Sequence, residues 1–95
     1  MYKDLDPLLH SQLRLTIVSH LVKQPSSDFK ELKELTNANS GNVSIQLNKL
    51  EQAGYITLTK SFKDNYPHTS VELTPAGLAA FEAYVDALKG YLNQE

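Results

Sequence analysis

Cysteine is absent from the sequence. Its absence excludes disulfides, a thiolate nucleophile, an iron–sulfur cluster and any zinc site built on cysteine, and it fits a reducing compartment. An apolar run of about 18 residues, which a membrane-spanning helix needs, is also missing. Asp4 and Asp6 stand near the start, where a signal peptide would need cations. We therefore expect a soluble, cytoplasmic protein that does not bind a membrane.

The sequence also lacks internal repeats and a large surplus of either charge. Nine lysines and arginines face eleven acids, and this net charge of −2 fits neither a polybasic tail nor a disordered acidic chain. Apolar residues make up 41% of the 95 positions, which is enough for one small core and too little for two. We predict a single domain spanning residues 1–95.

No set of catalytic or metal-binding side chains converges in the pattern. The three histidines, His10, His20 and His68, fall in separate segments with no acid at a telling spacing. On one helix His10 and His20 would lie about 15 Å apart, too far to share a metal ion. The four glycines are isolated, so a glycine-rich phosphate loop is missing. We predict no catalytic residue, no metal and no cofactor, and hence a protein that is not an enzyme.

The first part of the chain carries the signals of two helices. Residues 11–22 show an apolar residue at every fourth position, which predicts a helix with one buried stripe. Ser27 or Asp28 can cap a second, shorter helix, and Glu31 follows Asp28 at the spacing of a capping box. The polar residues 37–39 then predict a turn.

A third helix and a β-hairpin follow. Ser40 offers an N-cap and Gly54 a stop, which predicts a helix over about residues 40–53. After Gly54 the apolar period changes to two, which indicates a pair of strands. Their connection, about residues 62–68, is too long for a two-residue turn and rich in turn formers, so we expect a projecting loop.

Thr74 and Pro75 predict the start of a long last helix over about residues 75–92. The fold class is therefore mainly α with a small β-hairpin, an α+β winged helix-turn-helix with a long C-terminal helix. A three-helix bundle with an accessory hairpin would use the same elements and is the alternative.

The third helix has two contrasting faces. Val43, Leu47 and Leu50 share one edge and are expected to be buried. The opposite face carries amides, hydroxyls, a lysine and one branched apolar residue, a set that can contact base edges, phosphates and thymine methyl groups. The helix start adds backbone N–H groups that can hold a phosphate. The predicted DNA-binding residues are Ser40, Gly41, Asn42, Ser44, Ile45, Asn48 and Lys49 on the helix and Lys60, Lys63, Asn65 and His68 on the hairpin.

The last helix has an apolar arc wider than one packing contact uses. Leu78, Phe81, Val85, Leu88 and Leu92 form one stripe, and Ala80, Tyr84, Ala87 and Tyr91 form a second beside it. We expect one stripe to cover the first helix and the other to contact a second copy of the chain. The predicted homodimer interface comprises Leu5, Leu8, Leu9, Phe81, Tyr84, Leu88 and Tyr91. A wider intramolecular core is the alternative.

The segment 40–56, Ser-Gly-Asn-Val-Ser-Ile-Gln-Leu-Asn-Lys-Leu-Glu-Gln-Ala-Gly-Tyr-Ile, is followed by two strands and by Leu-Thr-Pro-Ala-Gly at 73–77. In order and spacing it resembles the MarR-type winged-helix transcriptional regulators, above all their compact single-domain group. The similarity begins at Leu-Asp-Pro-Leu-Leu-His, residues 5–10, and includes the position of Arg14. It implies a homodimeric regulator that places the helix of residues 40–53 in the major groove and uses residues 62–68 as the wing, on double-stranded DNA with a pseudo-palindromic operator.

The chain departs from this pattern in its wing. Such regulators tend to carry more lysine and arginine there, whereas residues 64–68 hold no permanent cation and Arg14 is the only arginine. A winged-helix module for protein–protein contact without DNA binding is therefore the alternative function. Dimers of this type can also hold a small-molecule effector, near which only Tyr84 and Tyr91 would lie.

Overall fold

The computed structural model describes residues 2–93. In chain order the elements are α1 (Gln12–Lys23), β1 (Ser26–Asp28), α2 (Phe29–Thr36), α3 (Ser40–Gln52), β2 (Ile56–Lys63), β3 (Tyr66–Leu73) and α4 (Pro75–Leu92). The strands form one antiparallel sheet in the order β1-β3-β2. The predicted α+β winged helix-turn-helix fold with a long last helix is confirmed.

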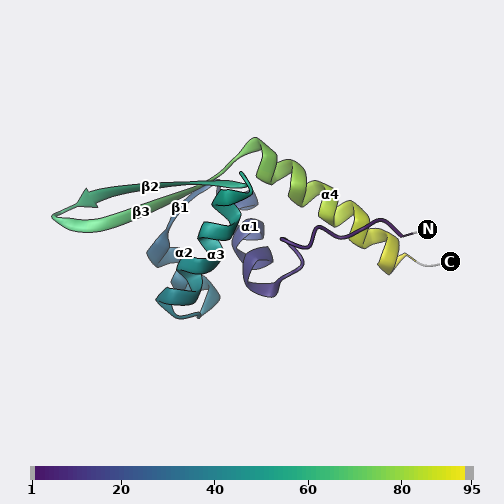
Figure 1. Cartoon of the computed structure of the whole chain (residues 1–95), viewed down its shortest axis with the longest axis horizontal. Helices are drawn as coiled ribbons and strands as arrows, with labels where there is room; N and C mark the ends of the chain where they lie inside the picture. Colours follow the sequence, from purple (N-terminus) through teal and green to yellow (C-terminus); the bar gives the residue numbers. More distant parts are fainter. Residues whose placement is uncertain (1, 94–95) are drawn as a thin grey trace.

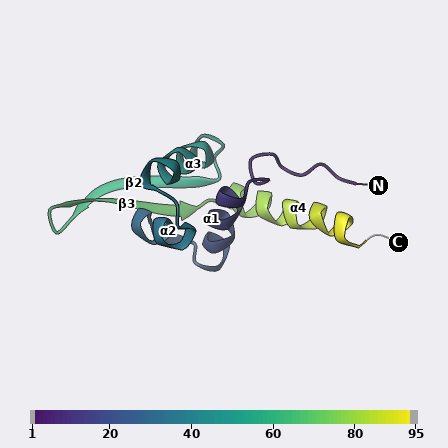
Figure 2. The same ribbon diagram turned by 90° about the horizontal axis from the view of Figure 1, so that it is seen from below.

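The molecule is elongated, with extents of 57 × 25 × 21 Å. Helices α1, α2 and α3 form a central body, and the β2–β3 hairpin and α4 leave it in opposite directions (Figure 1). The segment before α1 runs out beside α4, so both ends of the described part of the chain lie far from the hairpin tip (Figures 1 and 2). The fold therefore has a hairpin end and a terminal end, separated by the helical body.

The core lies between the three short helices and the base of the sheet. Its fully buried apolar side chains are Leu9, Ile17, Val18, Leu21, Leu32, Val43, Leu47, Leu50, Ile56 and Val71, each at most 2% exposed. The buried edge predicted for α3 is thus confirmed. Two residues of α4 are also buried. Tyr84 packs in this core and is 5% exposed, and Ala87 is 4% exposed.

Side-chain caps set most helix starts where the sequence predicts them. Asp28 accepts the backbone N–H of Glu31 at 2.8 Å, and Thr74 accepts that of Gly77 at 3.0 Å. The prediction of Ser40 as the cap of α3 is wrong, because Asn39 keeps an extended backbone and its side chain accepts the N–H of Asn42 at 2.8 Å. Ser40 is already the first helical residue.

The sheet differs from the sequence prediction in two ways. The three residues of β1 pair with β3, a strand too short for the alternation pattern to reveal. The expected loop over residues 62–68 is wrong, since the strands run to Lys63 and from Tyr66 and only Asp64 and Asn65 form the turn. Both have positive φ, 52° and 66°, as a two-residue type I′ turn requires, and these are residue types that tolerate it.

The structure has one joint, which is the place where the end of α3, the start of β2, the end of β3 and the start of α4 meet. Gly54 ends α3 with φ 81°, as its predicted role as a helix stop requires. The hydroxyl of Thr74 donates to the Gly54 carbonyl at 2.6 Å, and the Thr74 N–H donates to the Tyr55 carbonyl at 3.0 Å. Gly77 packs so closely that an added Cβ would lie 2.2 Å from the Tyr55 oxygen. The start of α4 is therefore seated directly on the backbone that begins β2.

The N-terminal arm, residues 2–11, is tied to this joint and to α4. The Tyr55 hydroxyl donates to the Asp6 carboxylate at 2.5 Å, and this hydrogen bond raises the pKa of Tyr55 to about 12. Lys3 forms an ion pair with Asp86 at 2.8 Å. Tyr2 stacks on Tyr91 with ring centroids 4.7 Å apart. The arm thus lies along α4.

Two residues predicted for the dimer interface belong instead to the chain's own core. Leu9 is 0% exposed and Tyr84 is 5% exposed. The Tyr84 hydroxyl also lies 3.0 Å from Nδ1 of His10, on the turn that precedes α1. Neither side chain has surface left for a partner, because the stripe of α4 that carries Tyr84 is the one that covers α1 and the arm.

Within residues 2–93, the helices are too short or too polar for any of them to cross a bilayer.

The cap of α2 gives the fold a pH-dependent contribution. The N–H of Glu31 and, less strongly, His68 at 3.3 Å lower the pKa of Asp28 below 3.8. Because the folded carboxyl holds its proton less tightly than the unfolded one, its stabilisation is present above about pH 4 and is lost as the pH falls through the lowered pKa.

We predict that Asp28→Asn lowers the free energy of unfolding at pH 6 by up to about 1 kcal/mol, since Asn caps helices about as well and only the charge is removed. The difference between the two proteins should shrink as the pH falls from about 4 through the lowered pKa of Asp28. Urea denaturation followed by circular dichroism at pH 6 and at a series of pH values below 4 measures it. A difference that stays constant with pH would contradict the assignment.

Candidate nucleic-acid interface

The outward face of α3 matches the predicted DNA-binding face. Ser44, Ile45, Asn48 and Lys49 are all exposed, and Ile45 is 54% exposed although it is branched and apolar. These side chains are held outward because Val43, Leu47 and Leu50 anchor the other side of the helix in the core. The face combines hydrogen-bonding groups, one cation and one apolar contact, which suits readout of base edges.

The start of α3 is an open backbone surface. The pattern predicts unpaired backbone N–H groups at Ser40, Gly41 and Asn42, but that of Asn42 is paired, because the Asn39 side chain accepts it. A Cβ added to Gly41 would meet only the Asn39 side-chain oxygen, at an ordinary 3.5 Å. The protein itself therefore has room for a side chain at position 41, and the glycine leaves that room to a ligand.

A hydrogen-bonded chain that the sequence analysis missed links the N-terminal arm to this helix start. Arg14 donates from Nε to the Leu8 carbonyl at 2.6 Å and from Nη1 to the Gln46 side chain at 2.5 Å. Gln46 in turn donates to Oδ1 of Asn42 at 2.9 Å. Arg14 thus fixes α1, the arm and the first turns of α3 against one another. Only its position in the family resemblance pointed to it.

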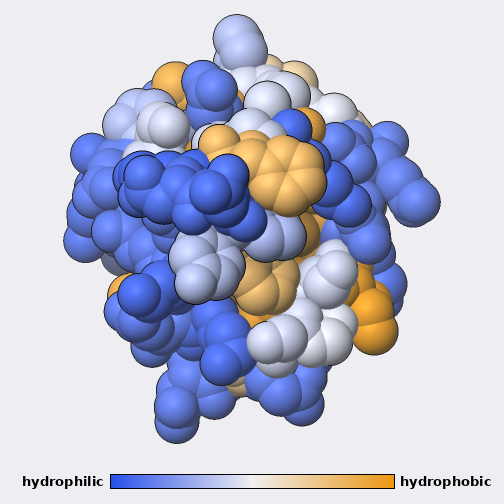
Figure 3. Space-filling model, turned by 90° about the vertical axis from the view of Figure 1, so that its left-hand side faces the viewer, coloured by the Kyte–Doolittle hydropathy of each residue, from blue (hydrophilic) through white to orange (hydrophobic). Residues whose placement is uncertain are grey.

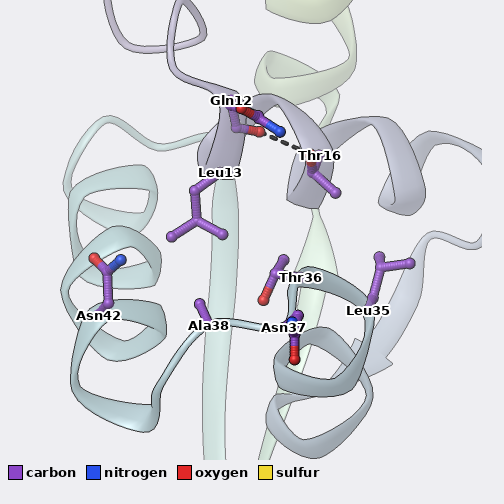
Figure 4. Close-up of a pocket in the computed structure, with 8 residues that line it drawn as sticks. All are labelled: Gln12, Leu13, Thr16, Leu35, Thr36, Asn37, Ala38 and Asn42. Carbon is purple, nitrogen blue, oxygen red and sulfur yellow. Dashed lines mark hydrogen bonds between the residues drawn. The ribbon is translucent and has the colours of Figure 1, made fainter.

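The turn between α2 and α3 completes the helix-turn-helix. Asn37 ends α2 in the left-handed conformation, with φ 56°, and confirms the predicted turn. Between this turn and α1 lies an open hollow of about 370 Å³ (Figure 4). It is lined by Gln12, Leu13, Thr16, Leu35, Thr36, Asn37, Ala38 and Asn42. All of them are uncharged, so the hollow offers hydrogen bonds but no charge to a ligand.

The hairpin and α3 share one concave surface. Ser44 and Asn48 of α3 line a hollow of about 140 Å³ together with Lys60 and Thr69 of the hairpin. The structure therefore brings together predicted residues that lie more than ten positions apart in the sequence. Closer to the hairpin tip, a wider hollow of about 620 Å³ places Lys63 with Lys30 of α2, a cation that the sequence analysis did not select.

The remaining predicted wing residues have different surroundings. Asn65 lies at the hairpin turn and is exposed. His68 is only partly exposed, and its Nε2 lies 3.3 Å from the Asp28 carboxylate. The side chain of His68 therefore holds the hairpin to the start of α2, which leaves it less free for DNA than the prediction assumed.

The charges divide between the two ends. Residues 40–69 hold three lysines and two acids, and Lys30 lies beside them. From residue 70 to 93 there is one lysine against Glu72, Glu82 and Asp86. The acidic surplus thus lies on β3 and α4 and away from the outward face of α3, as an approach to a polyanion favours.

Comparison with known proteins identifies the family to which this chain belongs. Residues 13–92 match the family described as the winged helix DNA-binding domain. An uncharacterized protein of Methanocaldococcus jannaschii is 31% identical over 78 residues, which are 82% of this chain and 85% of that protein.

Solved structures share the fold. A transcriptional regulator homologue from Pyrococcus horikoshii is 25% identical and has a TM-score of 0.83, over 90% of this chain and 84% of that one. A mutant MarR from E. coli in complex with operator DNA is 20% identical, with a TM-score of 0.74, over 90% of this chain and 61% of that one. The chain therefore belongs to the winged helix DNA-binding domain family, and its fold is that of MarR-like transcription regulators, not of enzymes.

Proposed function

We propose that the protein regulates transcription by binding double-stranded DNA as a homodimer, with α3 in the major groove and the hairpin on the adjacent backbone and minor groove. The observation that carries this proposal is the concave surface shared by Ser44, Asn48 and Lys60. A helix and a projecting ribbon that meet in this way fit a duplex, whose major groove admits one helix and whose backbone runs beside it.

The polar groups of the interface divide into those that position the protein and those that read sequence. Lysines, above all Lys49, Lys60 and Lys63, are exposed and suited to phosphates. The side chains of Ser44 and Asn48 are suited to base edges, and Ile45 to a thymine methyl group. The open backbone at Gly41, at the positive end of the helix dipole, can approach a phosphate.

The terminal end of the molecule supports the proposed homodimer. Along α4 the stripe with Leu78 and Leu92 keeps apolar surface exposed, 40% and 72%, while the stripe with Tyr84 is buried in the chain's own core. We propose that this exposed stripe, which includes Phe81 and Leu88, contacts a second copy together with Leu5 and Leu8 of the arm and with Tyr91, the 37% exposed last member of the other stripe. A two-fold dimer would set the two copies of α3 about 34 Å apart, which calls for a pseudo-palindromic operator.

The first test is titration of the protein with a mixed-sequence duplex at several salt concentrations, followed by fluorescence anisotropy. The affinity should fall with salt, and Lys49→Ala should reduce the slope of log K against log salt by about 0.9 for each phosphate that the lysine neutralises. The melting temperature of the Lys49→Ala variant should equal that of the unaltered protein, because Lys49 is exposed. A protein that ignores the duplex even at low salt would overturn the proposal in favour of a protein-binding module.

Gly41→Ala separates DNA contact from folding. The new methyl group has room in the free protein, and alanine favours a helix by up to about 1 kcal/mol over glycine, so the melting temperature should rise. DNA affinity should nevertheless fall, because the methyl group would occupy the space of the phosphate. Gly90→Ala is the matched control, since a Cβ there meets nothing within 4 Å and lies in α4. Unchanged affinity of Gly41→Ala would remove the helix start from the interface.

Leu92→Asp tests the dimer. The side chain is 72% exposed in the single chain, so the charge should cost little within one copy but should disfavour burial between two. Sedimentation equilibrium should show two chains for the unaltered protein and a dissociation constant raised at least about tenfold for the variant. Asn93→Asp adds the same charge one residue further and should stay dimeric. Identical behaviour of both variants would place the contact elsewhere.

A further inference from the structure

Two aromatic side chains near the hairpin tip, Phe62 and Tyr66, are exposed to solvent. Phe62 is 78% exposed and Tyr66 is 74% exposed, more than any core-forming aromatic of the described chain. The end view of the molecule is mostly hydrophilic and has a hydrophobic cluster near its centre (Figure 3). A phenylalanine this exposed contributes little to the core, and its side chain is open to contact with another molecule.

The tip is a stiff projection. Strand β1 pairs with β3 only as far as Ser70, and His68 still contacts Asp28, so it is the turn and the residues next to it that project from the body. Ladder pairing nevertheless continues to Lys63 and Tyr66, and the two-residue turn closes it tightly. The backbone pairing therefore presents the tip side chains in a fixed orientation.

The two aromatics point to opposite faces of the ribbon. Residues directly opposite in the ladder share a face, and faces alternate along each strand. Phe62 lies opposite Pro67 and shares its face with Leu58 and Lys60, both of which line the hollow with α3. Tyr66 lies opposite Lys63 on the other face. Phe62 is therefore on the side of the hairpin that faces the proposed DNA.

The ribbon extends past α3. Lys60 is the residue of β2 nearest the tip that lines the hollow with α3, and Phe62 lies two residues further out. At a rise of about 3.4 Å per residue, Phe62 is about 7 Å beyond Lys60. With α3 in a major groove, a ribbon that extends past the helix runs over the phosphate backbone toward the neighbouring minor groove, so Phe62 would lie on the side of that groove.

We propose that Phe62 makes an apolar contact in that minor groove, against deoxyribose or a partly opened base step, and that Lys60 on the same face holds a flanking phosphate. The inference rests on the proposed function and adds a residue to it. The tip from residue 64 to 68 holds no lysine or arginine, so its contact with the groove is apolar or polar rather than cationic. Apolar side chains enter minor grooves as wedges, most easily at flexible pyrimidine–purine steps.

The test compares Phe62→Thr with Tyr66→Thr in the full chain. Threonine suits a strand, so both variants should keep the hairpin, and the two positions are matched in exposure and lie in neighbouring pairs of the ladder. In anisotropy titrations with a mixed-sequence duplex, Phe62→Thr should weaken binding about tenfold or more. Tyr66→Thr should change it less than about threefold.

Salt dependence adds a readout that responds to removal of a cation and not to removal of an apolar side chain. Phe62→Thr should keep the slope of log K against log salt, whereas Lys60→Ala should reduce it by about 0.9 for each phosphate that the lysine neutralises. Three results would overturn the proposed minor-groove contact of Phe62 and leave the proposed function intact. They are equal effects of the two threonine variants on affinity, no effect of Phe62→Thr on affinity, and a changed salt slope for Phe62→Thr. A shift of Phe62→Thr to fewer chains in sedimentation would assign Phe62 to contact between copies instead. Failure of the unaltered protein to bind duplex at low salt would overturn both.

Discussion

The seat of α4 on the Tyr55 carbonyl is the contact on which the rest of the arrangement depends. Only a glycine at position 77 allows the helix to approach this closely, since any Cβ would overlap the Tyr55 oxygen. Thr74 caps the same helix and donates back to Gly54, so one threonine joins the end of α3 to the start of α4. Because β2 starts and β3 ends at this joint, it fixes the directions in which the hairpin and α4 leave the body.

The same joint connects the two ends that the proposed function needs. The proposed DNA face lies on α3 and the hairpin, and the proposed dimer face lies on α4 and the N-terminal arm. Tyr55 anchors the arm through Asp6, while Arg14 ties the arm to Gln46 of α3. The spacing between two copies of α3 in a dimer would therefore be set by a few hydrogen bonds and one close packing contact, not by a flexible linker.

The charge distribution explains how a chain with a net charge of −2 fits a DNA-binding family. Few lysines serve the outward face of α3 and the hairpin, and the acids lie mainly on β3 and α4. With so few cations, contacts that need no charge would contribute a larger share of the DNA-binding free energy. These contacts are the helix start at Gly41, the polar face of α3 and the apolar tip at Phe62. Doubling of these contacts by a second copy would raise the affinity further.

The sequence by itself determined the four helices, the hairpin and the buried edge of α3, because helical and strand periods of apolar residues are local signals. It also determined the outward residues of α3, since a helix that buries Val43, Leu47 and Leu50 must expose the opposite side. The pattern did not reveal β1, because its three residues show no alternation and form a strand only through pairing with β3. The pattern also predicted a longer loop where the structure has a tight turn at Asp64 and Asn65.

Only the tertiary structure decided which surfaces meet and which stay open. Neither the pairing of His68 with Asp28 nor the link from Arg14 to Gln46 follows from local spacing, because the partners are far apart in the chain. The two stripes of α4 look alike in sequence, and packing alone buries Tyr84 and leaves Leu92 exposed. The face of the hairpin that carries Phe62 likewise depends on the register between β2 and β3, which long-range hydrogen bonds set.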